Sequence, residues 1–181
     1  MKNIKLNYNE NIKYEKEINK VRAVVLNKEG RALLVHYAGL YMLPGGKIEE
    51  NETQEEALKR EIAEETGIEI EPSQAEKFLV INSYSENYYD REQKKEINRI
   101  TNTNFYFITT NQDIDLTHTH LTESEKEGDQ KVKFENLSII PYLVQNNKSN
   151  NKKREQFDIE IQTALKEFIN YREEKQNAKE K

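Results

Sequence analysis

Carboxylate side chains gather in one short stretch of this 181-residue chain. Three of them, Glu61, Glu64 and Glu65, are spaced so that an α-helix would place them on one face. Like charges at this spacing repel each other by roughly a few tenths of a kcal/mol per pair. Arg60 can pair with Glu64, but one guanidinium does not neutralise three carboxylates. A Mg²⁺ or Mn²⁺ ion would, because both metals prefer oxygen ligands.

The residues around these carboxylates predict a helix with a defined start and end. Thr53 and Glu56 have the spacing of a capping box, and Gly67 is the residue type that commonly ends a helix. Before the helix, Gly45 and Gly46 lack a Cβ, so their backbone carbonyls can approach a bound ion. We therefore expect a loop, a helix and a second loop that build a metal site.

The spacing across the whole stretch goes beyond that of an ordinary charged helix. Residues 46–68 read Gx5Ex7REUxEExGU, where U is apolar, and the fixed positions are filled by Gly46, Glu52, Arg60, Glu61, Ile62, Glu64, Glu65, Gly67 and Ile68. This stretch resembles the complete Nudix box, the motif of metal-dependent hydrolases that cleave a diphosphate linkage in a nucleoside diphosphate joined to another group. A solvated acidic helix face is the alternative interpretation of the three carboxylates taken alone.

The resemblance implies a role for each matching residue. The implied metal ligands are Glu61, Glu64, Glu65 and a backbone carbonyl of Gly45 or Gly46, with Mg²⁺ or Mn²⁺ as the cofactor. The implied catalytic group is Glu64, Glu65, Arg60 and Glu52, in which Glu52 is an auxiliary ligand and Arg60 orients the glutamates. In this family the catalytic base often comes from a late loop, so the candidate general bases are Glu123, Glu125 and Glu127.

The resemblance also implies the fold class, an α/β/α sandwich with a mixed sheet and the box helix packed on it. Alternating and β-branched residues predict strands at 21–27, 32–37, 41–43, 77–85, 102–110 and 132–137. The first two are expected to form a hairpin, the strands at 77–85 and 102–110 an antiparallel pair, and residues 86–98 a hairpin loop or an insertion. In the first strand of that pair, alternation places Phe78 and Leu79 on opposite faces.

Three parts of the chain are expected. Residues 1–19 are an N-terminal extension or edge strand, and residues 20–145 are the hydrolase domain. Residues 146–181 are a polar connector and a C-terminal amphipathic helix packed on the domain. The apolar stripe of that helix consists of Phe157, Ile161, Leu165 and Phe168, with Ala164 and Ile169 beside them.

Aromatic residues near the predicted site are candidates for substrate contact. We expect Tyr41, close to the glycines, and Tyr84, at a strand end, to bind substrate, with packing as the alternative. His36 and Tyr37 are expected to be ordinary strand residues. His118 and His120 are not expected to bind a transition metal, because no third soft ligand lies near them in the sequence.

The composition limits the cellular locations and the binding partners that we expect for this chain. The chain has no cysteine, which excludes disulfides and cysteine-ligated zinc and suits a cytoplasmic location. No signal peptide or long apolar run predicts secretion or membrane insertion. The net charge of −5 argues against nonspecific nucleic-acid binding, which needs a basic surface. A small nucleotide-type substrate is the expected partner, and a homodimer is left open.

The substrate is predicted only as a class. A nucleoside triphosphate or modified nucleotide is favoured, because the chain carries few additions to the motif. Nucleotide sugars, dinucleoside polyphosphates and RNA 5′ ends stay open, whereas the lack of cysteine disfavours an isopentenyl diphosphate isomerase. Two alternatives to hydrolysis are a non-catalytic nucleotide-sensing module, which would be expected to lose the carboxylates of the motif, and a domain that only binds Mg²⁺ or Ca²⁺.

Overall fold

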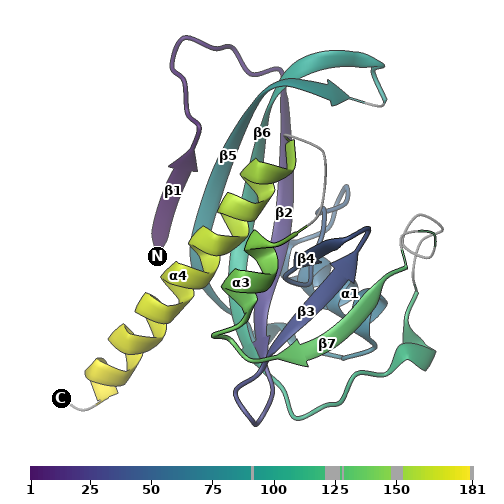
Figure 1. Ribbon diagram of the computed structural model, residues 1–181, viewed down its shortest axis with the longest axis vertical. Coiled ribbons are helices and arrows are strands. Elements are labelled where there is room, and N and C mark those ends of the chain that lie inside the picture. Colours follow the sequence, from purple (N-terminus) through teal and green to yellow (C-terminus); the bar gives the residue numbers. More distant parts are fainter. Residues whose placement is uncertain (91, 121–126, 128, 148–152, 180–181) are drawn as a thin grey trace.

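Helices lie on both faces of one mixed sheet in this computed structural model (Figure 1). The structure describes residues 1–90, 92–120, 127, 129–147 and 153–179, without the side chains of residues 153–155 and 179. The strands are β1 (Lys2–Leu6), β2 (Lys16–Leu26), β3 (Ala32–Tyr37), β4 (Leu40–Met42), β5 (Glu76–Asp90), β6 (Lys95–Thr109) and β7 (Lys131–Glu135). The α-helices are α1 (Gln54–Thr66), α3 (Ile140–Gln145) and α4 (Lys153–Lys179), and short 3-10 turns lie at Pro72–Gln74 and Leu116–His118.

The strand order is β1-β5-β6-β2-β3-β4, with β7 paired to β3. The pairs β1–β5 and β2–β6 are parallel, and the other pairs are antiparallel. Helix α1 packs on one face of this sheet, while α3 and α4 pack on the other. The expected α/β/α sandwich with a mixed sheet is therefore confirmed. No helix in the described ranges is long and apolar enough to span a lipid bilayer.

The hairpin of β5 and β6 is longer than the sequence predicted. The antiparallel pairing of these strands is confirmed, but the expectation of a loop over residues 86–98 is wrong. Pairing continues through Tyr88 with Ile97 and Tyr89 with Glu96. Aromatic and β-branched residues favour strands, so their presence within this charged segment lets the ladder extend to the pair of Asp90 with Lys95.

A bulge changes the alternation at the start of β5. The register shifts between Lys77 and Leu79, and Phe78 and Leu79 both join the core beneath α4. The expectation that these two side chains lie on opposite faces is therefore wrong. In β6 no bulge intervenes, and Phe105 faces α4 while Tyr106 faces α1, as its alternation predicts.

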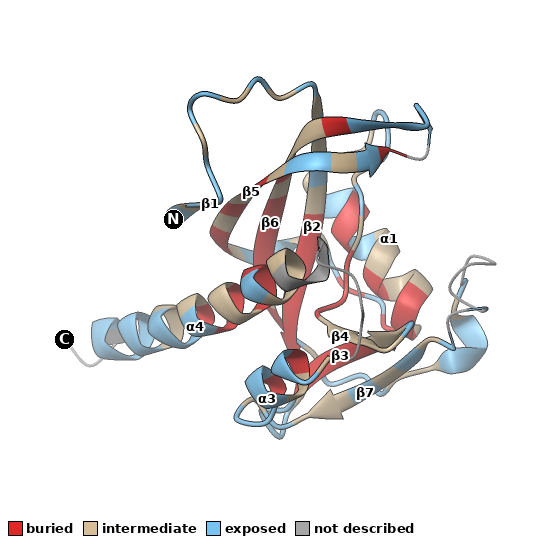
Figure 2. Ribbon diagram, turned by 45° about the horizontal axis from the view of Figure 1, so that its top comes forward, coloured by how far each residue is buried: buried red, intermediate tan, exposed pale blue. Residues whose placement is uncertain are grey.

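The two helical layers bury different parts of the chain (Figure 2). Under α4, the buried side chains include Ile161, Ala164, Leu165 and Phe168, whereas Ile169 is half exposed instead of lying beside this stripe. Helix α1 buries Ala57, Leu58 and Ile62 against the other face of the sheet. Its predicted boundaries are confirmed, since Thr53 and Glu56 form the capping box and Gly67 ends the helix with a φ of 70°.

Strands β2 and β3 separate beyond their turn, and the segment that contains Gly45 and Gly46 lies along β2 in the place of β3. Strand β3 pairs with β2 only at Leu26 and Ala32, so the predicted hairpin is present only at its turn. Beyond this point the edge of β2 is taken by residues 44–47, here called the glycine loop. The N–H of Val21 donates to Gly46 O, and the N–H of Ala23 donates to Pro44 O, both at 3.0 Å. The glycine loop therefore lies between β2 and α1.

Candidate active site

The glycine loop and helix α1 fit together through their smallest and most acidic residues. Glu65 is only 7% exposed, and its carboxylate accepts the N–H of Gly45 at 2.9 Å. Gly45 has a φ of 127°, and a Cβ there would overlap the backbone of β2. A Cβ at Gly46 would overlap the Glu61 carboxylate. Both glycines are therefore required for the close approach of this loop to β2 and to Glu61, while the predicted approach of their carbonyls to a metal ion stays a prediction.

Arg60 joins three of the carboxylates into one network. Its Nε lies 2.7 Å from one oxygen of Glu52, and a terminal nitrogen lies 2.9 Å from the other. The second terminal nitrogen donates to Glu61 at 2.9 Å and to Glu64 at 3.1 Å. The hydrogen bond from Arg60 is the main reason why the pKa of Glu52 is lowered, and the carboxylates in turn raise the pKa of Arg60. Arg60 thereby fixes the positions of side chains that the sequence placed in the site.

Arg60 does not fully compensate the negative charge of the largely buried Glu61 carboxylate. Its side chain is 14% exposed, and burial raises its pKa, an effect that Arg60 opposes and Glu64 adds to. A buried carboxylate in this condition is stabilised by a nearby cation. The electrostatics therefore favour the binding of positive charge next to Glu61.

The carboxylate and carbonyl oxygens of this site suit a hard divalent cation, but their side chains do not converge on one point. Within the described ranges, no three Asp, Glu, His or Cys side chains converge as a metal site, and Glu61 and Glu64 both turn toward Arg60. The residues that would hold Mg²⁺ or Mn²⁺ offer only oxygen atoms, as these metals prefer. The carbonyl of Gly46 already accepts a hydrogen bond from β2, which leaves the carbonyl of Gly45 as the freer ligand.

A cavity of about 380 Å³, here called the active-site cavity, lies beside these groups. It is lined by Arg22, Tyr37, Leu40, Met42, Gly45, Gly46, Lys47, Glu61, Glu65, Gln130 and Phe157. Arg22 is 5% exposed; it donates to the carbonyl of Leu43, and its guanidinium carbon lies 5.1 Å from the centre of the Phe157 ring. Arg22 Nε and Gln130 Nε2 are buried without a hydrogen-bond partner in the part of the chain that the structure describes. Such donors are costly to bury unless a ligand satisfies them.

Sequence reasoning missed several of these lining residues. Arg22 was detectable, because it is a lone cation within the apolar run of β2, and a buried arginine requires a partner. Phe157 was assigned to the packing stripe of the last helix, yet it also lines the active-site cavity. Tyr37 was expected to be an ordinary strand residue and also faces this cavity. Nothing in the sequence singles out Gln130.

The two tyrosines predicted to bind substrate lie elsewhere. The Tyr41 ring packs 4.6 Å from His36, and its neighbours Leu40 and Met42 line the active-site cavity in its place. The Tyr84 ring packs among other tyrosines at 4.9 and 5.0 Å and lines a separate hollow between α4 and the β5–β6 hairpin. Their roles in substrate binding stay predictions.

The candidate general bases are placed only in part. Glu123 and Glu125 lie outside the described residues, and Glu127 is exposed. Near this segment, the backbone N–H of His120 donates to the carbonyl of Glu64 at 3.0 Å, and the His118 ring contacts Asp115 at 2.7 Å. The first of these contacts joins the segment before residue 121 to the end of α1, and the second lies within the segment. The choice among the three candidate bases stays a prediction.

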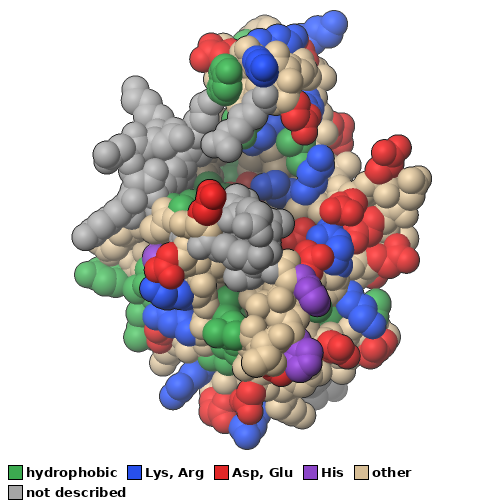
Figure 3. Space-filling view, turned by 90° about the vertical axis from the view of Figure 1, so that its right-hand side faces the viewer, with side chains coloured by type: hydrophobic (Ala, Val, Ile, Leu, Met, Phe, Trp, Pro, Cys, Tyr) green, Lys and Arg blue, Asp and Glu red, His purple; other side chains and the backbone are tan. Residues whose placement is uncertain are grey.

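The distribution of charged side chains on one face of the molecule agrees with the net charge of −5. Figure 3 shows acidic and basic side chains interspersed on that face, without a continuous basic patch over the described residues. Nonspecific nucleic-acid binding depends on such a patch. The positive charge relevant to a small anionic ligand lies instead inside the molecule, at residues such as Arg22.

Comparison with known proteins connects this geometry to one family. Residues 17–155 match the NUDIX domain. An 8-oxo-dGTP diphosphatase from Proteus vulgaris is 52% identical over 40 residues, which are 22% of this chain and 36% of that protein. The CTP pyrophosphohydrolase of Escherichia coli K12 is 42% identical over 55 residues, which are 27% of this chain and 41% of that protein. The matched stretch thus spans well under half the length of these curated relatives.

A solved structure shows the same fold. The dihydroneopterin triphosphate pyrophosphohydrolase of E. coli aligns with a TM-score of 0.53 over 83% of this chain and 94% of that one. The two sequences are 15% identical, so this likeness concerns the fold alone.

Proposed function

Because the chain belongs to the NUDIX domain family, we propose that it is a hydrolase that cleaves the diphosphate linkage of a nucleotide-type substrate with the help of a divalent metal ion. The observation that supports this proposal best is the make-up of the active-site cavity. Two carboxylates of α1, Glu61 and Glu65, line it together with both glycines and the buried cation Arg22. A diphosphate bound there would meet a cation from β2 on one side and metal-binding oxygens on the other.

The carboxylates of α1 would hold the metal ion. Glu61, Glu64 and Glu65 are the proposed ligands, with the carbonyl of Gly45 as a backbone donor. When bound, Mg²⁺ or Mn²⁺ would make a water molecule more acidic and offset negative charge on the phosphate oxygens. Arg60 would act through the glutamates by holding Glu52, Glu61 and Glu64 in fixed positions.

The cationic and aromatic residues of the cavity would bind and orient the substrate. Arg22 presents a buried Nε that lacks a partner among the described residues, and a phosphate oxygen would satisfy it. Phe157 and Tyr37 add apolar surface next to this guanidinium. The proton of the attacking water would pass to a carboxylate outside α1, and Glu123, Glu125 and Glu127 stay the candidates for that base.

A nucleoside triphosphate or modified nucleotide is the favoured substrate class. The curated relatives are named an 8-oxo-dGTP diphosphatase and a CTP pyrophosphohydrolase, so both names refer to triphosphates. A cavity of about 380 Å³ falls within the usual size of small-molecule sites, roughly 300–1,000 Å³.

Glu64→Gln tests the proposal with little risk to folding, because the Glu64 side chain is 37% exposed. Turnover of a panel of nucleoside triphosphates with Mg²⁺ should fall by roughly 10²–10³-fold, as expected when a preorganised charge is lost from a site of this kind. Glu55→Gln is the matched control, since Glu55 is an exposed carboxylate of the same helix, and it should keep full activity. Equal turnover by Glu64→Gln and the native protein would refute the assigned chemistry.

A further inference from the structure

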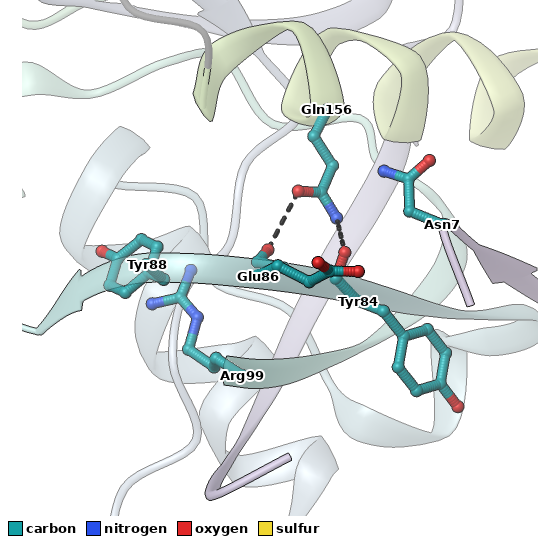
Figure 4. A pocket seen from close by; sticks show the side chains of 7 residues that line it. Asn7, Tyr84, Glu86, Tyr88, Arg99 and Gln156 are labelled. Atoms are coloured by element: carbon teal, nitrogen blue, oxygen red, sulfur yellow. Dashed lines mark hydrogen bonds between the residues drawn. The ribbon is translucent and has the colours of Figure 1, made fainter. Parts of the chain in front are cut away.

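A second hollow lies away from the active-site cavity, between the β5–β6 hairpin and the first turns of α4. This hairpin cavity has a volume of about 400 Å³ and is lined by Asn7, Tyr84, Ser85, Glu86, Tyr88, Arg99 and Gln156 (Figure 4). A smaller hollow of about 70 Å³ shares Arg99 with the hairpin cavity and Phe157 with the active-site cavity. The three hollows therefore follow one another along the face of the sheet that α4 covers.

Arg99 is the most unusual residue of the hairpin cavity. Its guanidinium carbon lies 3.4 Å from the centre of the Tyr88 ring, which fixes the plane of the group (Figure 4). Its Nε is buried without a hydrogen-bond partner, and no carboxylate of the described ranges forms an ion pair with it. Arg99 as a whole is half-buried, but a buried donor without a partner is costly, so this guanidinium is suited to an anion that arrives with a ligand.

The carboxylates nearby are already engaged. Glu160 lines the smaller hollow, and its two oxygens accept hydrogen bonds from hydroxyl groups on β5 and β6 at 2.6 and 2.8 Å. Glu86 is exposed at the rim of the hairpin cavity, where it accepts a hydrogen bond from Asn9. The positive charge of Arg99 is thus not matched by a direct partner from the described chain.

Lys20 extends the positive charge toward the active site. It lines the smaller hollow, and residues 20 and 22 of β2 point to the same face of the sheet. Burial lowers the pKa of Lys20 to about 8, and the cations Arg22 and Arg99 lower it further, while Glu160 and Glu61 oppose this effect. Three cations on this face therefore influence one another, and two carboxylates, Glu160 and Glu61, offset part of their positive charge.

The spacing of these cations suggests the shape of the ligand. Arg99 is in register with Lys16 on β2, six residues from Arg22, and six strand residues span roughly 20 Å. Long side chains shorten this gap, and Lys20 lies within it. A substrate with one phosphate in the active-site cavity and another at its far end would match such a series.

We infer that the hairpin cavity is an anion subsite in which Arg99 binds a phosphate carried by the part of the substrate remote from the diphosphate that is cleaved. The inference rests on the proposed function for the assignment of the cleaved end. It narrows the substrate class to nucleotides that carry a further phosphate. A free phosphate ion has the same chemistry as this group, so the test must separate the two sources.

The test measures binding to ligands that contain no diphosphate linkage, so that hydrolysis plays no part. Calorimetry at pH 7 without metal compares adenosine 3′,5′-bisphosphate with AMP, and the dinucleotide pApAp with pApA. In at least one pair, the added phosphate should increase affinity tenfold or more. Arg99→Met should remove this increase, with circular dichroism showing that the variant is folded. Lys95→Met, which removes an exposed cation of the same hairpin, should preserve it.

Three outcomes would overturn the inference. Equal affinity within both pairs would mean that no remote phosphate is bound, and a preference that survives Arg99→Met would place the phosphate elsewhere. Inorganic phosphate that binds through Arg99, without a preference in either nucleotide pair, would assign the subsite to the free ion. If the preference is found while the native protein hydrolyses no substrate, the subsite stands and the proposed hydrolase function falls.

Discussion

Arg60→Met is expected to destabilise the protein through the carboxylates it leaves behind. The guanidinium makes paired contacts with Glu52 at 2.7 and 2.9 Å and single contacts with Glu61 and Glu64. Removing one partner of a fully buried ion pair costs about 3–5 kcal/mol. The side chain of Arg60 is 25% exposed, so solvent screens part of this loss and we expect about 2–3 kcal/mol. For a chain of this size that corresponds to a fall in Tm of roughly 4–12 °C.

The pH dependence of this loss is a sharper test than its size. The pKa of Glu52 is lowered in the folded protein, mainly by Arg60. The stability gained from this ion pair is therefore fully present above the pKa that Glu52 has in the unfolded chain. It is lost as the pH falls through the lower pKa that Glu52 has in the folded protein. Urea unfolding at pH 7 and at decreasing pH below 4.5 should show the two proteins converging. Lys59→Met is the control, because its contact with Glu71 at 3.4 Å is exposed and worth at most about 1 kcal/mol. A difference of less than about 0.5 kcal/mol at pH 7, within the range of ordinary surface substitutions, would refute the argument.

Three further predictions concern other parts of the molecule. Gly46→Ala should reduce turnover by about tenfold or more, because the added Cβ displaces the Glu61 carboxylate that Arg60 holds in place; kinetics check this, with thermal unfolding showing that the variant is folded. Phe168→Ala should lower the free energy of unfolding by about 3–5 kcal/mol in urea titrations, since the ring is fully buried between Phe78 and Phe107. Affinity for adenosine 3′,5′-bisphosphate should fall as pH rises from 7 to 9, because Lys20, with a pKa of about 8, loses its proton; calorimetry on Lys20→Met should show a smaller change.

Local patterns predicted the parts of the fold that depend on local interactions. The capping box at Thr53 and Glu56 and the terminating Gly67 define α1 because each acts within a few residues of the helix end. The alternation in β6 correctly separates Phe105 from Tyr106. Helix capping and strand alternation are therefore readable from one sequence.

Features that depend on distant partners were not predictable in this way. The bulge at Phe78 lets two consecutive side chains enter one core, and its position is set by the pairing with β6. Likewise, β2 has an apolar pattern suited to a hairpin, yet its main partner is β6, from a part of the chain far along the sequence. Arg22 and Phe157 meet at the active-site cavity only because α4 returns to cover β2.

The glycine loop also bears on how the protein opens locally. One residue pair, Leu26 with Ala32, joins β3 to β2, so the amides of Val21 and Ala23 are protected by the loop and not by a neighbouring strand. Their hydrogen exchange therefore reports on the loop itself. If ligand binding tightens the loop against α1, these two amides should slow their exchange more than the amides of β2 that face away from the loop. Because this loop lines the candidate site and also completes a sheet edge, exchange at these two amides would show whether occupancy of the site is coupled to local opening of the fold.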